Sequence, residues 1–179
     1  MRRAVFLDRD GVVNKSVPRL HTHYGSPRHF NELVLMPGVR EAIDLIKEMN
    51  FLIVVVTNQP EVARGLLAAD ELDAMHSYIS RALPIDDIFV CPHDDEAGCE
   101  CRKPKPGMLL VAAEKWDIDL SRSFLVGDRP TDMGAAHAVG AQGILVGPAE
   151  FETKDSVMSA RDLLEAGHLI SDIAGPPNS

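Results

Sequence analysis

Five short runs of apolar, β-favouring residues alternate along this chain with segments of helical periodicity. The runs cover residues 4–7, 51–56, 88–90, 123–126 and 143–146. Between them, apolar residues recur with a helical period over 39–49, 72–83, 109–116 and 132–139. Strands that alternate with helices pair in parallel, and the helices then cover both faces of the sheet. The sequence therefore predicts a three-layer α/β fold with a mainly parallel sheet.

The size of the chain suits a single domain. With 179 residues, of which 45% are apolar, it can bury its own core without disulfide support. We expect one domain over residues 1–174. A disordered tail is expected over residues 175–179, which contain two consecutive prolines.

The negative net charge of the chain excludes some classes of binding partner. A formal net charge of −9 argues against a general nucleic-acid binder and against a basic membrane-surface protein, because both need a positive field. Asp8 cuts the first apolar run too short for a secretory signal, and no later run could span a bilayer. We therefore expect a cytoplasmic protein that binds a small molecule. The oligomeric state stays open, and a monomer is compatible with the sequence.

Four polar motifs stand at the ends of the predicted strands. They are Asp8-Arg9-Asp10-Gly11, Thr57-Asn58-Gln59, Arg102-Lys103-Pro104-Lys105 and Gly127-Asp128-Arg129-Pro130-Thr131-Asp132. Ligands of open parallel sheets bind outside the carboxyl ends of the strands, where the connecting loops meet. An acidic residue after a strand is often only a helix cap or a turn former. Four such motifs in register are better explained by a shared site.

The two aspartates of the first motif have the chemistry needed for phosphoryl transfer. Asp8 is the candidate nucleophile, and Asp10 can protonate the leaving oxygen and then activate water. The negative charges of nucleophile and phosphate must be neutralised for attack to occur, which Mg²⁺ achieves. Since Mg²⁺ prefers oxygen ligands and keeps several waters, we expect Asp8, Asp128 and the carbonyl of Asp10 to hold it.

Other side chains can stabilise the charge of the transferred group. Thr57 offers a hydroxyl, Asn58 a backbone N–H and Lys103 a positive charge to the phosphoryl oxygens. Arg102 can bind a second anionic or hydroxyl group of the substrate through two hydrogen bonds. Arg129 is placed to meet a substrate phosphate. The alternative for Arg102 and Lys103 is a solvated surface pair.

Two further residues near these motifs are open to two interpretations. Asp132 lies one helical turn beyond Asp128, where it can orient a metal-bound water or simply favour the start of a helix. Lys105 stands between two prolines, and its sequence context does not decide whether it faces the site.

All three cysteines of the chain lie in one short segment. Cys91, His93, Cys99 and Cys101 supply three sulfurs and one imidazole within residues 91–101, hereafter the cysteine loop. This is a complete ligand set for a structural Zn²⁺ site, which is closed and tetrahedral. The alternative is that the thiols are free and buried beside a histidine. A disulfide framework is disfavoured because the number of cysteines is odd. The loop leads directly into Arg102 and Lys103, so a bound Zn²⁺ would hold these cations over the site.

One segment between the first two strands lacks periodicity. Residues 12–35, hereafter the flap, contain prolines, a glycine and three histidines. Long irregular segments in compact domains often carry function. We therefore expect a loop that lies over the site.

Taken together, these motifs resemble those of the haloacid dehalogenase superfamily of phosphatases over nearly the whole chain. The cysteine loop and the following residues 102–108 are similar to the subgroup of D-glycero-D-manno-heptose 1,7-bisphosphate 7-phosphatases, whose relatives are the histidinol-phosphate phosphatases. The resemblance implies a Rossmann-like domain with a minimal cap, catalytic Mg²⁺ and structural Zn²⁺. It also implies that Asp8 is the nucleophile, Asp10 the acid and base, and Arg102 a substrate-recognition residue. Thr57 and Lys103 would stabilise the phosphoryl group.

The resulting hypothesis is a Mg²⁺-dependent phosphoric monoester hydrolase that works through an aspartyl-phosphate intermediate. A heptose 1,7-bisphosphate is the favoured substrate, cleaved at the 7-phosphate. Histidinol phosphate or another small phosphate monoester is the alternative. A hypothesis of another class is a zinc-stabilised module that binds phosphorylated ligands without catalysis, which the presence of both Asp8 and Asp10 disfavours.

Overall fold

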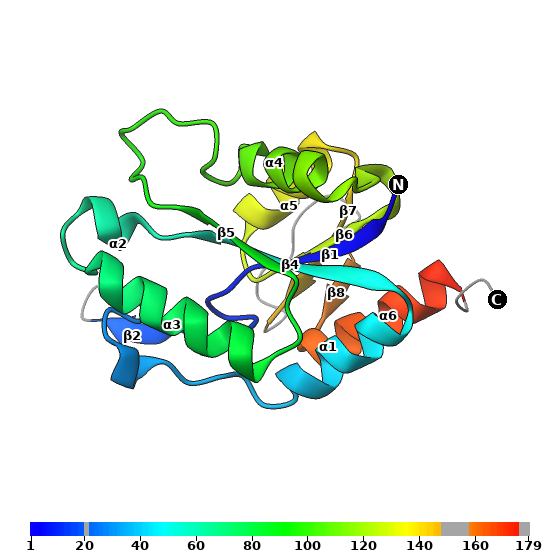
Figure 1. Cartoon of the computed structure of the whole chain (residues 1–179), viewed down its shortest axis with the longest axis horizontal. Coiled ribbons are helices and arrows are strands. Elements are labelled where there is room, and N and C mark those ends of the chain that lie inside the picture. Colours follow the sequence, from blue (N-terminus) through cyan, green and yellow to red (C-terminus); the bar gives the residue numbers. More distant parts are fainter. Residues whose placement is uncertain (20–21, 148–157, 176–179) are drawn as a thin grey trace.

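A six-stranded parallel sheet forms the centre of the protein (Figure 1). We describe a computed structural model over residues 1–19, 22–147 and 158–175. The strand order is β5-β4-β1-β6-β7-β8, and all pairs in this sheet are parallel. The strands are β1 (Arg3–Leu7), β4 (Phe51–Asn58), β5 (Asp87–Cys91), β6 (Phe124–Gly127), β7 (Gln142–Val146) and β8 (Met158–Ala160).

Helices cover both faces of the sheet, as Figure 1 shows. They are α1 (Val39–Glu48), α2 (Pro60–Ala63), α3 (Ala69–Ala82), α4 (Gly107–Trp116), α5 (Pro130–Ala138) and α6 (Leu163–Ala174). Successive side chains of a strand point to opposite faces. In β1, Val5 and Leu7 therefore pack in the core with α1, α3 and α6, whereas Ala4 and Phe6 pack with α4 and α5. The predicted three-layer α/β fold is confirmed.

The predicted periodic segments correspond to real elements, because each of them buries one face. In α1, the residues with a helical period are the buried ones, namely Val39, Ala42, Ile43 and Ile46. The strands β1 and β4 are almost continuously buried, as expected for strands covered on both faces. One boundary differs from the prediction: Thr57 lies inside β4, which continues to Asn58, and does not follow the strand.

The flap is more regular than its sequence indicates. It contains the strands β2 (Val17–Arg19) and β3 (Thr22–Gly25), which form an antiparallel pair, and the short 3-10 helix η1 (Phe30–Glu32). The expectation of an irregular loop was therefore wrong over these residues. Strands of three and four residues are too short to produce a recognisable alternation of apolar and polar positions. This small hairpin is the minimal cap of the fold.

Two elements near the end of the described chain were not predicted. The strand β8 has only three residues and extends the sheet beside β7. The helix α6 packs against α1 and buries Leu163, Ala166, Gly167 and Ile170. The start of α6 is encoded locally, because the Asp162 carboxylate accepts a hydrogen bond from the backbone N–H of Glu165 at 2.9 Å. Of the tail expected over 175–179, Gly175 is the C-cap of α6 and residues 176–179 lie outside the described ranges.

The order of the strands determines where a ligand can bind. From β1 the chain moves outward to β4 and β5, and it then returns to the other side of β1 to form β6, β7 and β8. The loops that leave β1 and β6 therefore run in opposite directions and open a crevice between them. Asp8 and Asp128 directly follow these two strands. The fold thus brings the first and last of the four motifs to the same crevice.

Candidate active site

A cavity of about 890 Å³ opens at the carboxyl ends of the central strands. Its walls come from the loops that follow β1, β4, β5 and β6 and from the flap. The lining residues from the predicted set are Asp8, Asp10, Asn58, Arg102, Lys103, Asp128 and Arg129. Thr57 is buried beneath them, with 1% of its surface exposed. The structure therefore brings the predicted phosphoryl-transfer residues together.

Three carboxylates meet at the floor of the cavity. One oxygen each of Asp8, Asp128 and Asp132 lies within 4.8 Å of the others, and we call this group the carboxylate trio. Lys103 neutralises part of its charge, because its Nζ lies 2.8 Å from Asp8 Oδ1 and 2.5 Å from Asp132 Oδ1. Lys103 Nζ also donates to the carbonyl of Val56 at 2.8 Å. Lys103 is thus a buried cation, and the alternative of a solvated surface residue is wrong for it.

The single positive charge of Lys103 does not balance the three carboxylates of the trio. Burial raises the pKa of Asp8 to about 6, with Lys103 acting against the shift and Asp132 adding to it. Burial and the neighbouring Asp8 raise the pKa of Asp128 to about 7. One oxygen of Asp128, Oδ1, is buried without a hydrogen-bond partner among the described residues. A divalent cation between these oxygens would supply the missing partner and favour the ionised carboxylates.

Glycines allow the loops to approach closely around the trio. Gly11 has a φ of +91°, and a Cβ built on it would lie only 2.2 Å from Oδ2 of Asp128. A Cβ on Gly127 would meet the Asp132 side chain at 2.3 Å. The chain therefore turns at Gly11 in a conformation that favours glycine, and both glycines are required sterically by the carboxylates beside them.

The Asp10 carboxylate lies outside the trio and is surrounded by donors. It accepts hydrogen bonds from Arg9 at 3.0 and 3.1 Å, from Asn14 at 2.9 Å, and from Ser26 and Gln59 at 2.8 Å. Burial opposes its ionisation, but the Arg9 charge and these hydrogen bonds hold the pKa of Asp10 below its ordinary value. Because these hydrogen bonds occupy the carboxylate of Asp10, the group of this residue that could bind a metal ion is its backbone carbonyl.

The second motif supports both Asp10 and Lys103. Gln59 is fully buried, and its Nε2 donates to Asp10 Oδ2 and to Thr57 Oγ1, both at 2.8 Å. Because Thr57 Oγ1 accepts this bond, the Thr57 hydroxyl keeps its hydrogen as a donor. The Asn58 side chain binds both backbone groups of Lys103, since Nδ2 donates to the carbonyl and Oδ1 accepts from the N–H, each at 3.1 Å. Asn58 therefore fixes the position of Lys103.

Three cationic side chains line the rim of the cavity, and each has different partners. Arg102 is half-buried, and its Nε donates to Asp95 Oδ1 at 2.8 Å. Arg129 lines the cavity, with its Nε 3.7 Å from Asp128 Oδ1. Lys105 also lines the cavity, but its Nζ donates to Gly98 and Glu100 of the cysteine loop. The question left open for Lys105 is thus answered in part, since its ammonium is bound to that loop.

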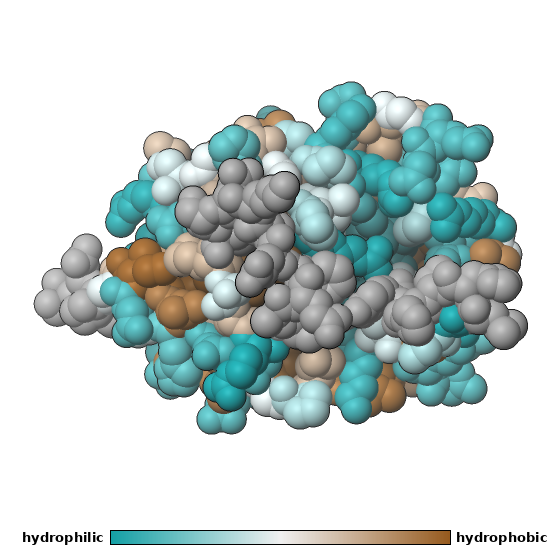
Figure 2. All heavy atoms as spheres, turned by 180° about the vertical axis from the view of Figure 1, so that it is seen from behind, coloured by the Kyte–Doolittle hydropathy of each residue, from teal (hydrophilic) through white to brown (hydrophobic). Residues whose placement is uncertain are grey.

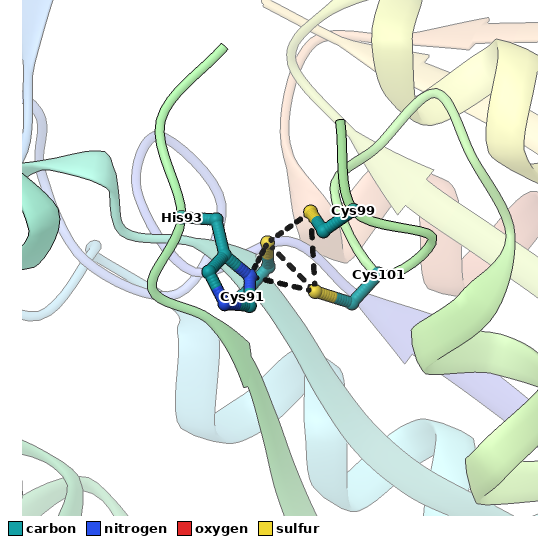
Figure 3. Close-up of side chains that lie close together, drawn as sticks. All are labelled: Cys91, His93, Cys99 and Cys101. Atoms are coloured by element: carbon teal, nitrogen blue, oxygen red, sulfur yellow. Dashed lines mark hydrogen bonds between the residues drawn. The ribbon is translucent and has the colours of Figure 1, made fainter. Parts of the chain in front are cut away.

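The thiols and the imidazole of the cysteine loop converge on one point (Figure 3). The distances between Sγ atoms are 3.0 Å for Cys91 and Cys101, 3.5 Å for Cys99 and Cys101, and 3.6 Å for Cys91 and Cys99. Nδ1 of His93 lies 3.2 Å from the Cys101 sulfur. These separations exceed a disulfide bond of about 2.05 Å. They approach the edge of about 3.8 Å expected for ligands at about 2.3 Å around one ion. The group is a possible metal site.

The flap is tied to the site and to the helices beside it. Ser26 Oγ donates to Asp10, and Arg28 forms an ion pair of 3.0 Å with Glu61 of α2. Within the flap, the Arg19 guanidinium binds both carboxylate oxygens of Glu32. The hydrogen bonds from Arg19 hold the pKa of Glu32 down at about 2. The flap therefore lies over the site, as expected, and contributes a side chain to it.

Sequence reasoning missed several residues that shape the site. Asp132 belongs to the trio, and its Oδ2 also accepts a hydrogen bond from the backbone N–H of Arg129 at 3.1 Å at the start of α5. The helix-start interpretation is therefore confirmed, and the role toward a metal-bound water stays a prediction. Arg9, Asn14, Gln59 and Ser26 were not singled out, although all four donate to Asp10. Only Arg9 and Gln59 stood inside a motif that could have pointed to them.

Neither the helices of the described ranges nor the surface in Figure 2 points to a membrane-spanning segment there. Within residues 1–19, 22–147 and 158–175, no helix is both long enough and apolar enough to cross a lipid bilayer. On the face seen in Figure 2, hydrophilic side chains predominate and the apolar ones gather mainly at one end of the molecule.

Comparisons with known proteins show what the chain as a whole is similar to. The family model described as HAD-hydrolase-like matches residues 100–166. A D-glycero-β-D-manno-heptose-1,7-bisphosphate 7-phosphatase of Rhodopseudomonas palustris is 36% identical, covering 91% of this chain and 91% of that protein. The enzyme of the same name from Pseudomonas putida is 40% identical over 80% and 82% of the two chains. The crystal structure of D,D-heptose 1,7-bisphosphate phosphatase from B. bronchiseptica, complexed with magnesium and phosphate, has a TM-score of 0.83. It is 32% identical and covers 96% of this chain and 99% of that one.

Proposed function

Because this chain belongs to the haloacid dehalogenase superfamily, among its D-glycero-β-D-manno-heptose-1,7-bisphosphate 7-phosphatases, we propose that it hydrolyses the 7-phosphate of a heptose 1,7-bisphosphate. It is a phosphoric monoester hydrolase, as expected from its sequence. The observation that carries the assignment of the site is the buried carboxylate trio with Lys103 at the floor of the cavity. A cavity of about 890 Å³ has the size of a typical small-ligand site.

We assign catalytic Mg²⁺ to the trio. Its oxygen ligands are of the kind that Mg²⁺ prefers, and a bound cation would satisfy Oδ1 of Asp128, which is buried without a hydrogen-bond partner among the described residues. Asp8, Asp128 and the Asp10 carbonyl would hold the ion, and Asp132 would orient one of its waters. When bound, Mg²⁺ neutralises the charge that otherwise repels the phosphate from Asp8. The magnesium and phosphate named for the B. bronchiseptica enzyme support this assignment.

In the proposed reaction, Asp8 is the nucleophile. An oxygen of its carboxylate attacks phosphorus, the bond between phosphorus and the sugar oxygen breaks, and an aspartyl phosphate forms. Lys103 Nζ, 2.8 Å from Asp8 Oδ1, is placed to neutralise the phosphoryl oxygens as charge accumulates on them. Thr57, through its hydroxyl, and Asn58, through its backbone N–H, add hydrogen bonds to the same oxygens.

Asp10 is proposed to move the proton in both steps. Its proton passes to the sugar oxygen as that oxygen leaves, and it then takes a proton from the water that attacks the aspartyl phosphate. This second attack releases inorganic phosphate and restores Asp8. Arg9 and the other donors lower the pKa of Asp10 in the free protein. In the proposed reaction, Asp10 therefore takes up a proton from solvent as the negatively charged substrate enters, and this is the proton that it donates.

The rim of the cavity is proposed to bind the rest of the substrate. Arg102 has the planar donor geometry that suits a second phosphate, and it would leave Asp95 to bind one. Arg129 lines the same cavity, beside Asp128. A bisphosphate therefore finds a cation at the rim as well as at the floor.

We assign structural Zn²⁺ to Cys91, His93, Cys99 and Cys101. Four soft or borderline ligands around one point, with no carboxylate among them, are typical of closed zinc sites. Burial and the neighbouring Cys101 thiol raise the pKa of Cys91 to about 12, so this thiol stays protonated unless a cation binds. Lys103 follows Cys101 by two residues, and the ion would thus fix the loop that delivers Lys103 to the trio.

The substrate assignment is tested by measuring phosphate release with Mg²⁺ from heptose 1,7-bisphosphate, in both anomeric forms, and from histidinol phosphate. We expect a kcat/KM for one heptose bisphosphate anomer that exceeds the value for histidinol phosphate by at least about a hundredfold. Higher activity on histidinol phosphate would contradict the heptose assignment and leave the phosphatase assignment standing. Analysis of the released sugar by phosphorus NMR identifies which phosphate has been removed.

The magnesium assignment predicts a dependence of stability on pH. A carboxyl group whose pKa is raised in the folded state destabilises the fold as pH rises from its ordinary value, 3.8, through the raised one. For Asp8 and Asp128 this interval ends at about pH 6 and pH 7. At pH 5 protons compete with Mg²⁺ for both groups, whereas at pH 8 both are ionised. We therefore expect Mg²⁺ to raise the melting temperature more at pH 8 than at pH 5.

Thermal unfolding followed by circular dichroism, with and without Mg²⁺ at both pH values, checks this result. The Asp128→Asn variant is the matched comparison, because it removes one titrating ligand and should reduce the shift at pH 8. Equal Mg²⁺ effects at the two pH values would argue against binding at the trio.

A further inference from the structure

A histidine that is distant from the motifs in the sequence contacts a buried residue of the site. His76 lies on α3, and its Nε2 is 3.1 Å from Nη1 of Arg9. Arg9 is completely buried, although it is charged. Its remaining donors, Nε and Nη2, make three hydrogen bonds of 3.0 to 3.1 Å with the Asp10 carboxylate. The line His76–Arg9–Asp10 therefore runs from a surface helix to the proposed acid and base.

The roles of the atoms in this contact are fixed by chemistry. A guanidinium has donors only, so Nε2 of His76 must accept the hydrogen bond and cannot carry a hydrogen. The imidazole is then neutral, with its hydrogen on Nδ1. Burial and the Arg9 charge lower the pKa of His76 to about 4, which agrees with this neutral form.

Helix packing holds His76 in place. Its neighbours on α3, Met75 and Ile79, are fully buried, and they fix the rotation of the helix against the rest of the protein. A buried guanidinium needs all its donors satisfied, because each unpaired donor in the interior costs free energy. Without His76 Nε2 as the acceptor for Nη1, the Arg9 side chain would lower its free energy by turning toward water or toward another acceptor. Its hydrogen bonds with Asp10 would then lengthen.

We infer that His76 is a positioning residue for catalysis, which orients the Asp10 carboxylate by accepting a hydrogen bond from Arg9. This inference rests on the proposed function, since it assumes that Asp10 moves the proton. His76 touches neither the substrate nor the reacting atoms. Its removal should therefore slow the chemical steps and leave substrate binding largely intact.

Two substitutions separate the hydrogen bond from the packing. In His76→Gln, the amide oxygen can take the place of Nε2 as the acceptor, and in His76→Met a side chain of comparable size offers Arg9 no good acceptor. The control is His168→Met, which replaces an exposed histidine of α6 that does not line the site cavity. For each variant, kcat and KM are measured with Mg²⁺ and the heptose bisphosphate, together with the melting temperature.

We expect His76→Met to lower kcat by about tenfold to a hundredfold, with KM changed less than about twofold, because a hydrogen bond to a charged group is lost. His76→Gln should keep kcat within about threefold of wild type, and His168→Met should have no effect. Equal loss of kcat in His76→Met and His76→Gln, or a loss that follows the melting temperature alone, would overturn the inference.

A spectroscopic measurement tests the contact without any activity. Nitrogen-15 NMR of the imidazoles should show His76 neutral at pH 7 with its hydrogen on Nδ1, as a guanidinium partner at Nε2 requires. A hydrogen on Nε2 would refute the contact even if the enzyme is fully active. If instead the tautomer is as expected and no phosphate ester is cleaved by the wild type, then the proposed function fails and the contact stands.

Discussion

The Asp8→Asn variant should release no phosphate from any substrate of the wild type, and its fold should be intact. Asparagine has nearly the shape of aspartate but no charge with which to attack phosphorus, so we expect kcat to fall by at least about four orders of magnitude. Stability should not suffer. Burial raises the pKa of Asp8 to about 6, so at pH 7.5 its ionised form destabilises the fold, and Lys103 keeps Asp132 as its counter-charge.

The assay is phosphate release at pH 7.5 with Mg²⁺, and circular dichroism gives the melting temperature. Asp172→Asn, at an exposed position of α6, is the matched control and should behave like wild type. A melting temperature at or above that of the wild type, without turnover, is the expected combination. Activity near the wild-type value would assign the nucleophile to another side chain, and a collapsed fold would show that the loss of activity is not chemical.

The second large effect is expected from Cys101→Ser. Untreated wild-type protein should contain about one zinc per chain, and the variant should contain little or none, because it removes one of the four proposed ligands. Cys101 stands two residues before Lys103, whose Nζ is the buried counter-charge of the trio. We expect kcat to fall by about a hundredfold or more as the cysteine loop loses its fixed shape and Lys103 its fixed position.

Metal analysis by mass spectrometry, limited proteolysis and the phosphatase assay together check this result. The cysteine loop should become sensitive to protease while the far-ultraviolet spectrum of the sheet and helices changes little. Glu96→Gln is the control, because Glu96 is an exposed residue of the same loop outside the ligand set. If zinc is lost and kcat is unchanged, the ion does not position Lys103.

The regular part of the fold could be predicted from the sequence because burial gives each element a period. The residues that repeat in α1, such as Ile43 and Ile46, are the ones that pack against the sheet. The short strands of the flap and β8 have too few residues to show any period. The helix α6 is different, because its periodicity and the Asp162 cap were both present in the sequence and were overlooked.

The predictable part of the site consists of residues that follow strands. Asp8 and Asp128 could be placed at one edge because parallel strands end together. Contacts between side chains could not be placed in this way. The contact between Asp132 and Lys103 depends on how α5 is rotated against the sheet. The contact between His76 and Arg9 depends in the same way on the rotation of α3. No local pattern encodes that rotation, which results from the packing of the whole core.

The position of β1 at the centre of the sheet has a consequence for how this protein is made. The ribosome produces β1 before the other strands of this sheet, yet its two partners are β4 and β6, which are completed only at residues 58 and 127. The nascent chain therefore carries an apolar strand with one edge unpaired until most of the polypeptide has emerged, which exposes it to aggregation. The carboxylates of the trio cannot meet before Asp132 has been synthesised, so no early fragment could gain stability from the Mg²⁺ that we propose for this site.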